Sequence, residues 1–422
     1  MEAVTANRDM PQLPYMTADL PGIGGRIKEH VTDFRVEEVP LYEPCGEGTH
    51  VYFRVTKAGI PTPEAVNRLA RYFNVPPHEI GVAGLKDARA VSSQMMSLEH
   101  VAPAALASFH DPAMSVQVLG LHGNKLRPGH LRANRFVIRI RGVSAEQLPA
   151  AEAVLDVLRR RGVPNYFGEQ RFGARNDTAY LGECMVRNDL EEFLAIFLGR
   201  PQSADPPDCR AARDAFDEGQ YARALKRWPW HYQNERKALS VYRKRQRAGA
   251  AMVPIDKRMK RLYVSAFQSL IFNEVVIRRI DSLDQVLVGD MAEKADNGAI
   301  FTVEDPAAEQ PRADRFEISP TGVIVGYRSN LAGGQPGQIE AEVLERHRIT
   351  PEDFKNVGSL RPKGTRRALR FALGSPELSA GADERGPYMQ LTFTAASGCY
   401  ATVALREIMK LQPLGGGRQD NS

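Results

Sequence analysis

A single carboxylate between two basic residues is the first feature of this sequence that could do chemistry. Asp87 lies in the segment GVAGLKDARAVSSQ, residues 81 to 94, directly after Lys86 and two residues before Arg89. A carboxylate in a polar, flexible turn could act as a nucleophile or as a base. The same spacing also fits an aspartate that caps the start of a helix, which is the commoner reason for such a residue.

Two other segments combine residue types that could hold a planar ligand. The segment VPNYFGEQRFG, residues 163 to 173, places three aromatic side chains and Arg171 in a short turn. These rings could stack on bases or pack a domain junction, and packing is the commoner role. Asn134 and Phe136 begin a strand and project from one face of it, so they could pair with and stack on a base. A strand-start Asn and a core Phe is the simpler explanation.

Several other chemistries have no motif in this sequence. There is no G-x-x-x-x-G-K-S/T, no H-E-x-x-H and no G-x-S-x-G, and the GIGG at 22 to 25 lacks the preceding strand of a dinucleotide-binding turn. The four cysteines are far apart, without zinc spacing or a disulfide framework. We therefore expect no metal, no cofactor and a reducing, cytoplasmic location. No stretch is typical of a signal peptide or a membrane anchor, so no membrane partner is expected.

The basic residues are clustered rather than numerous. Lys and Arg number 56 against 51 Asp and Glu, which leaves a net charge of only +5. One region contains the residues that we interpret as contacts to a nucleic-acid backbone: Arg243, Lys244, Arg245, Lys257, Arg258, Lys260 and Arg261. A second cluster consists of Arg361, Lys363, Arg366, Arg367 and Arg370. Such clusters are usually solvated helix faces, but two of them in one chain favour a polyanionic partner.

The pattern of elements in the first 165 residues predicts an α+β fold, because strands and helices do not alternate regularly. After a flexible arm at 1 to 25, the sequence predicts a strand at His50 to Val55 and a helix at Pro63 to Phe73. Alternation from Phe136 to Ile140 indicates a half-buried strand, and a helical stripe then ends at Gly162.

The middle of the chain has a different texture, which indicates a separate unit. It contains a Pro-rich stretch, a basic helical stretch, a long apolar helix at Ala266 to Ile280 and a loop-rich passage from Asp290 to Gly337. Strand-like alternation returns at Gln390 to Ala395 and at Tyr400 to Leu405. The tail at 413 to 422 is expected to be disordered.

Four segments together resemble the TruD family of tRNA pseudouridine synthases. GLKDARAVSSQ is similar to the family's G-x-K-D-x-x-A-x-x-x-Q signature, and VPNYFGEQRFG is similar to its VPNYFG-x-QRFG hallmark. VSAFQSLIFN, residues 264 to 273, resembles the S-A-x-x-S-x-x-F-N helix. GCYATVALREIM, residues 398 to 409, resembles the closing G-S-F-A-T-x-x-x-R-E strand and helix. The matches keep the family order and span Lys28 to Met409.

The resemblance implies a pseudouridine synthase catalytic domain, with a mixed or antiparallel sheet and helices, at 26 to 165 and 371 to 412. It implies a TRUD insertion domain at 166 to 370 and a V-shaped cleft for tRNA between the two. By motif position it implies Asp87 as the catalytic residue. The same positions assign substrate binding to Lys28, Phe34, Asn134, Phe136 and Tyr400. Tyr400 stands where many members have Phe, and Cys399 replaces the usual Ser.

The implied reaction isomerises a uridine of tRNA, at position 13 of the D arm, by base flipping and without a cofactor or a protein partner, and a monomer is expected. Whether Asp87 attacks the ribose or acts through elimination stays open. The cation beside it could be Lys28, Lys86, Arg89 or a member of the 366 to 370 cluster. One alternative is a catalytically silent RNA-binding protein. Another is a glycosidase that uses a second acid, for which Glu37, Glu38 and Glu169 are candidates.

Overall fold

The computed structural model describes residues 10 to 410, and the chain forms two compact units. The sheet unit comprises Thr17–Val163 and the chain from Phe371 to the last described residue. The insertion unit comprises Pro164–Arg370 and residues 10 to 16. The chain passes between the units within β7 (Val163–Pro164) and β12 (Arg370–Phe371). Residues 1 to 9 of the expected flexible arm and the expected disordered tail lie outside the described residues.

The sheet unit is built on a mixed sheet in which the strand order is β13-β14-β6-β1-β4-β2-β5, with β3 paired to β4. β1 and β4 are parallel, whereas the other pairs are antiparallel. The strands are β1 (Phe34–Pro40), β2 (His50–Ala58), β3 (Gly81–Val82), β4 (Val91–Glu99), β5 (Met114–His122), β6 (Leu131–Arg141), β13 (Gly374–Asp383) and β14 (Gly386–Ala396). The helices are α1 (Thr62–Phe73), α2 (Pro103–Ala107), α3 (Leu148–Arg161) and α13 (Ala401–Met409).

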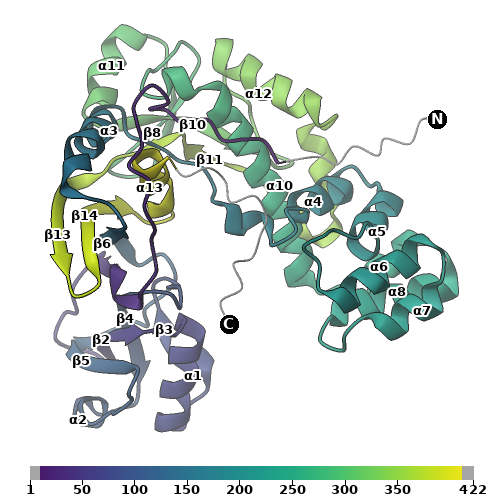
Figure 1. The fold of residues 1–422 in the computed structure, drawn as a ribbon, viewed down its shortest axis with the longest axis horizontal. Coiled ribbons are helices and arrows are strands. Elements are labelled where there is room, and N and C mark those ends of the chain that lie inside the picture. Colours follow the sequence, from purple (N-terminus) through teal and green to yellow (C-terminus); the bar gives the residue numbers. More distant parts are fainter. Residues whose placement is uncertain (1–9, 411–422) are drawn as a thin grey trace. The chain divides into compact units, whose positions relative to one another are not determined.

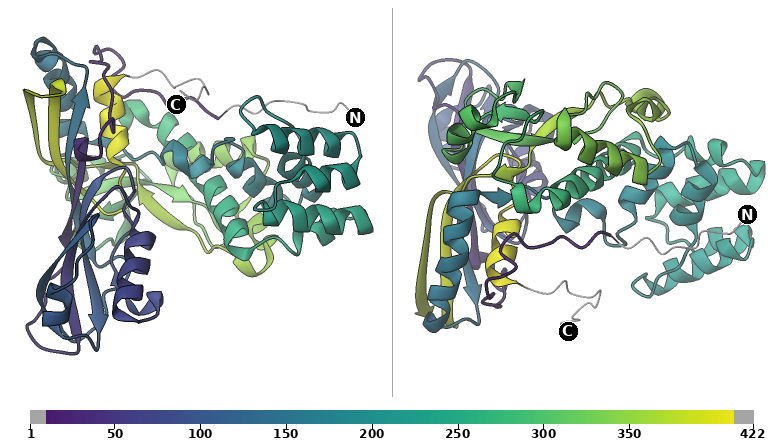
Figure 2. Two further views of the ribbon diagram at one scale, coloured as in Figure 1. Left: turned by 60° about the horizontal axis from the view of Figure 1, so that its bottom comes forward. Right: turned by 90° about the horizontal axis from the view of Figure 1, so that it is seen from above.

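The local patterns of the sequence explain most of these elements. β2 and α1 confirm the strand and the helix predicted there, and β6 confirms the alternating strand, with Phe136, Ile138 and Ile140 buried. Gly162 follows the last residue of α3 with φ of 83°, a conformation that glycine adopts without steric cost. α1 lies along the sheet (Figure 2) and buries Leu69 in a core with β2 and β4. The α+β fold class is confirmed.

The prediction of strand-like structure at Tyr400 to Leu405 is wrong, because residues 401 to 409 form α13. Ala401, Leu405 and Ile408 are buried at helical spacing, and a window of six residues could not separate this period from an alternation. From Thr17 on, the segment that we expected to be a flexible arm is packed. Thr17 donates both its backbone N–H (3.1 Å) and its hydroxyl (2.7 Å) to the buried carboxylate of Glu407 on α13.

The insertion unit combines a helical part with a small antiparallel sheet of order β11-β10-β8-β9 (Figure 1). Its helices are α4 (Thr178–Val186), α5 (Leu190–Leu198), α6 (Pro207–Asp217), α7 (Tyr221–Arg227), α8 (Gln233–Arg245), α9 (Ala248–Met252), α10 (Lys257–Arg278), α11 (Pro306–Asp314) and α12 (Gly334–Arg346). Its strands are β8 (Met291–Lys294), β9 (Ile300–Thr302), β10 (Ile318–Ile324) and β11 (Thr365–Ala368).

The long helix α10 is the central element of this unit. α4 lies against it at Gly182, where a Cβ atom would stand 2.1 Å from the carbonyl oxygen of Tyr263, so only glycine permits this approach. The expected apolar helix at Ala266 to Ile280 is confirmed, although it begins earlier, at Lys257. The passage from Asp290 to Gly337 is not the loop region that we expected, because three strands and α11 lie within it and α12 begins in it.

Candidate functional site

Asp87 lies in the loop between β3 and β4, and its side chain is 63% exposed. Its Oδ2 atom lies 3.5 Å from Nζ of Lys28. The ammonium group of Lys28 in turn lies 4.6 Å from the centre of the Phe34 ring. Lys28 has φ of 59°, a left-handed conformation that is uncommon outside glycine and that recurs at functional positions. Of the four kinds of cation considered from the sequence, the structure pairs Lys28 with Asp87.

Hydrogen bonds between buried side chains hold the loop that carries Asp87. The backbone N–H of Lys86 donates to Oγ1 of Thr62 at 2.8 Å, and the Thr62 hydroxyl donates to Oε1 of Gln94 at 2.8 Å. The amide of Gln94 donates to the carbonyl oxygen of Gly84 at 3.1 Å. Thr62 and Gln94 are buried. The glutamine at the end of the GLKDARAVSSQ segment therefore closes the loop in which the aspartate stands.

A buried ion pair anchors the same loop to β1. Nζ of Lys86 lies 2.6 Å from Oε1 of Glu38, and both side chains are almost fully buried. The other carboxylate oxygen of Glu38 accepts a hydrogen bond from the backbone N–H of Met95 at 3.0 Å. Since both oxygens of Glu38 are engaged, Glu38 is a poor choice for the second acid of a glycosidase. Glu37 pairs with Arg135 at the surface.

Lys57 on β2 provides a second cation near the loop that carries Asp87, and its side chain is buried. Its ammonium group donates to the carbonyl oxygens of Ile60 (2.7 Å) and Asp87 (3.4 Å). The pKa of Lys57 is lowered to about 8, mainly by burial and also by the nearby charge of Lys86, while the charges of Asp87 and Glu38 act in the opposite direction. Lys57 thus ties the backbone of Asp87 to the sheet by an interaction that depends on protonation.

The Phe34 ring, which lies next to Lys28, belongs to a group of aromatic side chains from β1, β6 and β14. Phe34 and Phe136 meet edge to face with 6.3 Å between their ring centres, and Phe136 stacks on Phe393 at 5.1 Å. Phe34 and Phe136 are only 5% and 7% exposed, so a small part of each ring can meet a ligand in this conformation. The aromatic group therefore both packs the core and supports Lys28.

Asn134 carries a polar atom that the described part of the chain leaves unsatisfied. It stands opposite Glu38 of β1 and opposite Ala395 of β14. Its Oδ1 atom is buried and has no hydrogen-bond partner among residues 10 to 410. An unmet buried acceptor costs about 1–3 kcal/mol, so a ligand that brings an N–H donor would be favoured there. Tyr400 is half-buried at the N-cap of α13, shortly after β14 ends.

Three arginines of the second basic cluster, Arg366, Arg367 and Arg370, make contacts inside the insertion unit. Arg366 pairs with Glu340 at 2.5 Å. Arg367 lies over the ring of Phe167, 4.4 Å from its centre, and Arg370 is buried. The charges of these three residues are therefore engaged within the insertion unit, which speaks against a contact with nucleic acid.

The segment VPNYFGEQRFG packs against α10, which confirms the packing explanation. The side chain of Asn273 accepts from the backbone N–H of Phe167 (2.8 Å) and donates to its carbonyl oxygen (3.0 Å). The ring of Phe167 meets Phe272 edge to face, and Arg171 donates to the hydroxyl of Ser269 at 3.2 Å. Two segments that the sequence separates by about a hundred residues therefore form one packed contact.

The residues interpreted as backbone contacts belong to the helical part of the insertion unit: Arg243, Lys244 and Arg245 end α8, and Lys257, Arg258, Lys260 and Arg261 begin α10. All are exposed except Lys260, which is half-buried, and burial lowers its pKa. The backbone N–H of Asp256 donates to Oδ1 of Asn234 at 2.8 Å, which places the start of α10 beside the start of α8. The two groups are therefore separated by most of α8, roughly 16 Å at 1.5 Å per residue.

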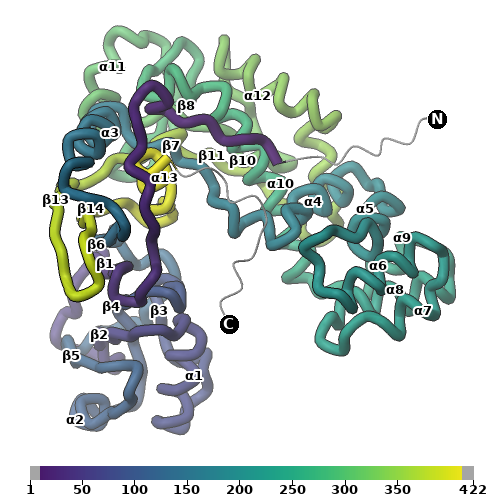
Figure 3. The backbone as a smooth tube through the Cα atoms, in the orientation of Figure 1, coloured from purple at the N-terminus to yellow at the C-terminus, as the bar shows by residue number. Residues whose placement is uncertain are grey.

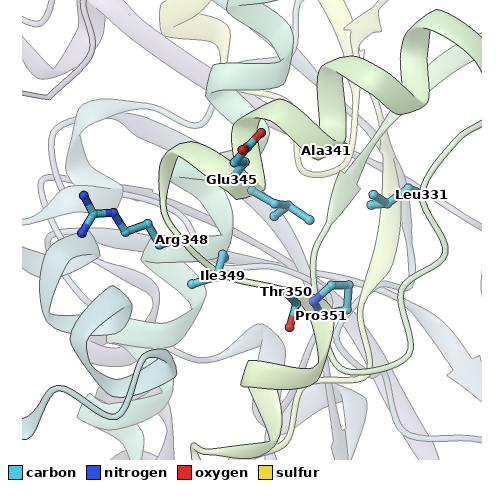
Figure 4. A pocket seen from close by; sticks show the side chains of 8 residues that line it. Leu331, Ala341, Glu345, Arg348, Ile349, Thr350 and Pro351 are labelled. Atoms are coloured by element: carbon cyan, nitrogen blue, oxygen red, sulfur yellow. The ribbon is translucent and has the colours of Figure 1, made fainter.

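A cavity of about 460 Å³ lies at the C-terminal end of α12, lined by Leu331, Ala341, Leu344, Glu345, Arg348, Ile349, Thr350 and Pro351 (Figure 4). None of the expected site residues lines it. Within residues 10 to 410, no three His, Cys, Asp or Glu side chains are grouped so as to hold a metal ion. No helix in that range has the length and apolar character needed to cross a membrane.

Sequence reasoning missed Lys57, Thr62 and the engagement of Glu38. Lys57 follows Phe53 and Val55 at the inward positions of β2, and a lysine in phase with buried apolar residues was the available signal. Nothing in the sequence indicated that Thr62, at the start of a helix, would bond to a loop more than twenty residues later.

Comparisons with known proteins match nearly the whole chain. The family model described as tRNA pseudouridine synthase D (TruD) matches residues 12 to 408. The chain is 43% identical to tRNA pseudouridine synthase D of Geobacter metallireducens over 407 residues, which cover 96% of this chain and 98% of the relative. It is 42% identical to the Geobacter sulfurreducens protein of that name, with the same coverage. A crystal structure from Methanosarcina mazei with the same description is similar at a TM-score of 0.85 and 28% identity, covering 95% of this chain and 97% of that one.

Proposed function

Because this chain belongs to the TruD family of tRNA pseudouridine synthases, we propose that it isomerises uridine 13 in the D arm of tRNA, with Asp87 as the catalytic carboxylate. The sheet unit would be the catalytic domain and the insertion unit the TRUD domain. A cytoplasmic location and a monomeric state belong to the same proposal.

The observation that carries the proposal is an exposed carboxylate paired with a cation, in a unit that also holds a buried acceptor without a hydrogen-bond partner among the described residues. Asp87 is open to solvent and faces Lys28 at 3.5 Å. Asn134 stands opposite Glu38. Glu38 forms an ion pair with Lys86, the residue before Asp87 in the chain. A uridine has a ring N–H that could donate a hydrogen bond to the buried Oδ1 of Asn134, and a ribose that Asp87 could reach.

The chemistry requires a flipped nucleotide, since a base inside folded tRNA cannot reach a carboxylate. Breaking the N-glycosidic bond and rejoining the ring through C5 leaves the RNA with the same atoms. Asp87 would attack the ribose or act in an elimination across it, and the geometry is compatible with either route. Lys28 would orient the carboxylate, while Phe34, Phe136 and Tyr400 would provide aromatic contacts to the base. Each stacked base contributes about 1–3 kcal/mol toward the cost of flipping.

The test is pseudouridine mapping after incubation of the protein with an unmodified tRNA transcript. Asp87→Asn keeps the volume of the side chain but removes its charge and its nucleophilic oxygen. We expect this variant to bind tRNA. Its rate of pseudouridine formation should be lower than that of the native chain by a factor of at least about 10³.

Glu37→Gln is the matched control, because Glu37 is an exposed carboxylate of the same sheet that pairs with Arg135. It should form pseudouridine normally. Normal product from Asp87→Asn would disprove the catalytic role. Release of free uracil, with loss also in Glu37→Gln, would point instead to a two-carboxylate glycosidase.

A further inference from the structure

The two tryptophans of the chain stand two residues apart in very different surroundings. Trp228 is 1% exposed, whereas Trp230 is 78% exposed. Both lie in the turn between α7 and α8, in the helical part of the insertion unit traced in Figure 3. An indole in solvent loses the burial that a large aromatic side chain normally gains, so Trp230 contributes little to the fold.

Contacts that do not involve the indole of Trp230 hold this turn in place. The ring of Trp228 meets Arg213 at 5.1 Å and Tyr232 at 5.3 Å. Arg236 donates to the carbonyl oxygen of Trp228 at 2.6 Å. The backbone carbonyl of Trp230 accepts from Gln233. Among the described residues, the one aromatic ring that the indole meets is that of the neighbouring His231, with 5.9 Å between ring centres. A rigid turn therefore presents a solvent-facing ring.

Exposed cations lie near both ends of the turn. Before it, the last residues of α7, Lys226 and Arg227, are exposed. After it, the hydrogen bond from Asp256 to Asn234 brings the exposed first residues of α10 next to the start of α8. These are Lys257, Arg258 and Arg261. An exposed aromatic ring among cations is the combination that binds unpaired nucleotides, in which the ring stacks on a base and the cations contact phosphates.

We propose that Trp230, with Lys257, Arg258 and Arg261, forms a second tRNA contact that stacks on an unpaired base of the tRNA. The inference rests on the proposed function, because it names tRNA as the partner. Charge complementarity favours RNA over another protein surface, and the exposed indole favours an unpaired base over a duplex, whose bases are already stacked. This contact adds affinity and takes no part in the chemical step.

The composition of the chain provides a direct probe, since Trp228 and Trp230 are its two indole fluorophores. Titration with unmodified tRNA should quench the emission of Trp230 in the native chain and protect it from iodide. In Trp230→Phe, where only the buried Trp228 remains, tRNA should leave the emission nearly unchanged. Emission of the native chain that does not change when tRNA is bound would overturn the proposal.

Binding affinity provides the second readout. Trp230→Leu should weaken tRNA binding about fivefold or more, and Trp230→Phe should restore most of it, because a ring is sufficient for stacking. Equal affinity of Trp230→Leu and the native chain would overturn the proposal. So would light scattering that shows a native dimer and a monomeric Trp230→Leu, since the ring would then contact a second copy.

The inference and the proposed function can fail separately. Pseudouridine formation by the native chain, together with unchanged binding by Trp230→Leu, would refute the second contact alone. Quenching of Trp230 by tRNA without any pseudouridine would support the contact and refute the catalytic assignment.

Discussion

Lys57 makes the conformation of a loop at the candidate site depend on a proton. It is buried, and its ammonium group donates to the carbonyl oxygen of Asp87 and to that of Ile60. No carboxylate among the described residues forms an ion pair with it, and its pKa is lowered to about 8. A charged donor holds a carbonyl more strongly than a neutral amine does, so the loop should loosen as Lys57 loses its proton.

We predict that Lys57→Met lowers kcat about 10- to 100-fold with little change in the KM for tRNA, because the carboxylate would be misplaced while the binding surfaces stay intact. In the native chain kcat should fall as the pH rises through about 8. In Lys57→Met that alkaline decline should be absent. Lys125→Met is the control, since the ammonium of Lys125 also donates to a backbone carbonyl, that of His78.

The decline of kcat in alkali can be distinguished from unfolding, because the contribution of Lys57 to the free energy of unfolding changes with pH in the opposite direction. The folded chain releases the Lys57 proton near pH 8, whereas an unfolded chain releases it near the ordinary value of 10.5. Between these values the unfolded state binds more protons, so the contribution of Lys57 to stability rises with pH. A kcat that stays constant from pH 7 to 9 in the native chain would contradict the role of Lys57.

At the scale of elements, His347 joins three helices of the insertion unit. It stands at the C-cap of α12 and is nearly buried. Its Nε2 lies 2.9 Å from Glu274 of α10, and its Nδ1 lies 3.4 Å from Glu183 of α4. Burial alone would lower the pKa of His347, but the hydrogen bonds and charges of the two glutamates outweigh burial and raise it to about 9.

The raised pKa predicts that this interaction weakens in mild alkali. The folded state holds the His347 proton up to about pH 9 and the unfolded state only to about 6.5, so the contribution is complete below 6.5 and is lost as the pH rises through 9. His347→Gln should lower the free energy of unfolding at pH 6 by about 2–4 kcal/mol and by much less at pH 9.5. Urea unfolding at both pH values measures the difference.

His100→Gln serves as the control, since the side chain of His100 is 83% exposed. It should leave the free energy of unfolding unchanged at both pH values. An equal loss of stability in His347→Gln at pH 6 and pH 9.5 would mean that the histidine acts by its shape rather than by its charge.

At the scale of the whole molecule, a net charge of +5 explains little about polyanion binding, whereas the placement of the charges explains more. The arginines at 366, 367 and 370 are used inside the insertion unit. Lys257, Arg258 and Arg261 at the start of α10 are exposed, although a helix N-terminus disfavours positive charge. Exposed cations that do not stabilise the helix they belong to are good candidates for contacts with phosphates.

Replacing Lys257, Arg258, Lys260 and Arg261 by Gln should weaken tRNA binding without lowering the melting temperature, because the first-turn cations oppose the helix dipole. The plot of log K against log salt should become less steep by about 0.7 to 0.9 for each phosphate that the protein no longer neutralises. Binding measured between 50 and 200 mM salt tests this, with the Arg243, Lys244 and Arg245 replacements run separately. An unchanged slope would identify the α10 cluster as a solvated face.

The sequence by itself determined the types of residue and their local periods. The alternation of β6 and the glycine that ends α3 are local features, and the structure has both as predicted. Local patterns gave a wrong prediction at α13, where the same residues fit both a strand period and a helix period. They also missed the short strands β8 to β10, because this passage is rich in Gly, Pro and Asp, which are typical of loops.

Only the tertiary structure decided which charges meet. Lys86 and Arg89 are the sequence neighbours of Asp87, yet Lys28 is its partner, and Lys86 pairs with Glu38 from a strand far earlier in the chain. The physical reason is that an ion pair depends on which strands lie side by side and which way their side chains point, and strand order is not encoded in any short segment.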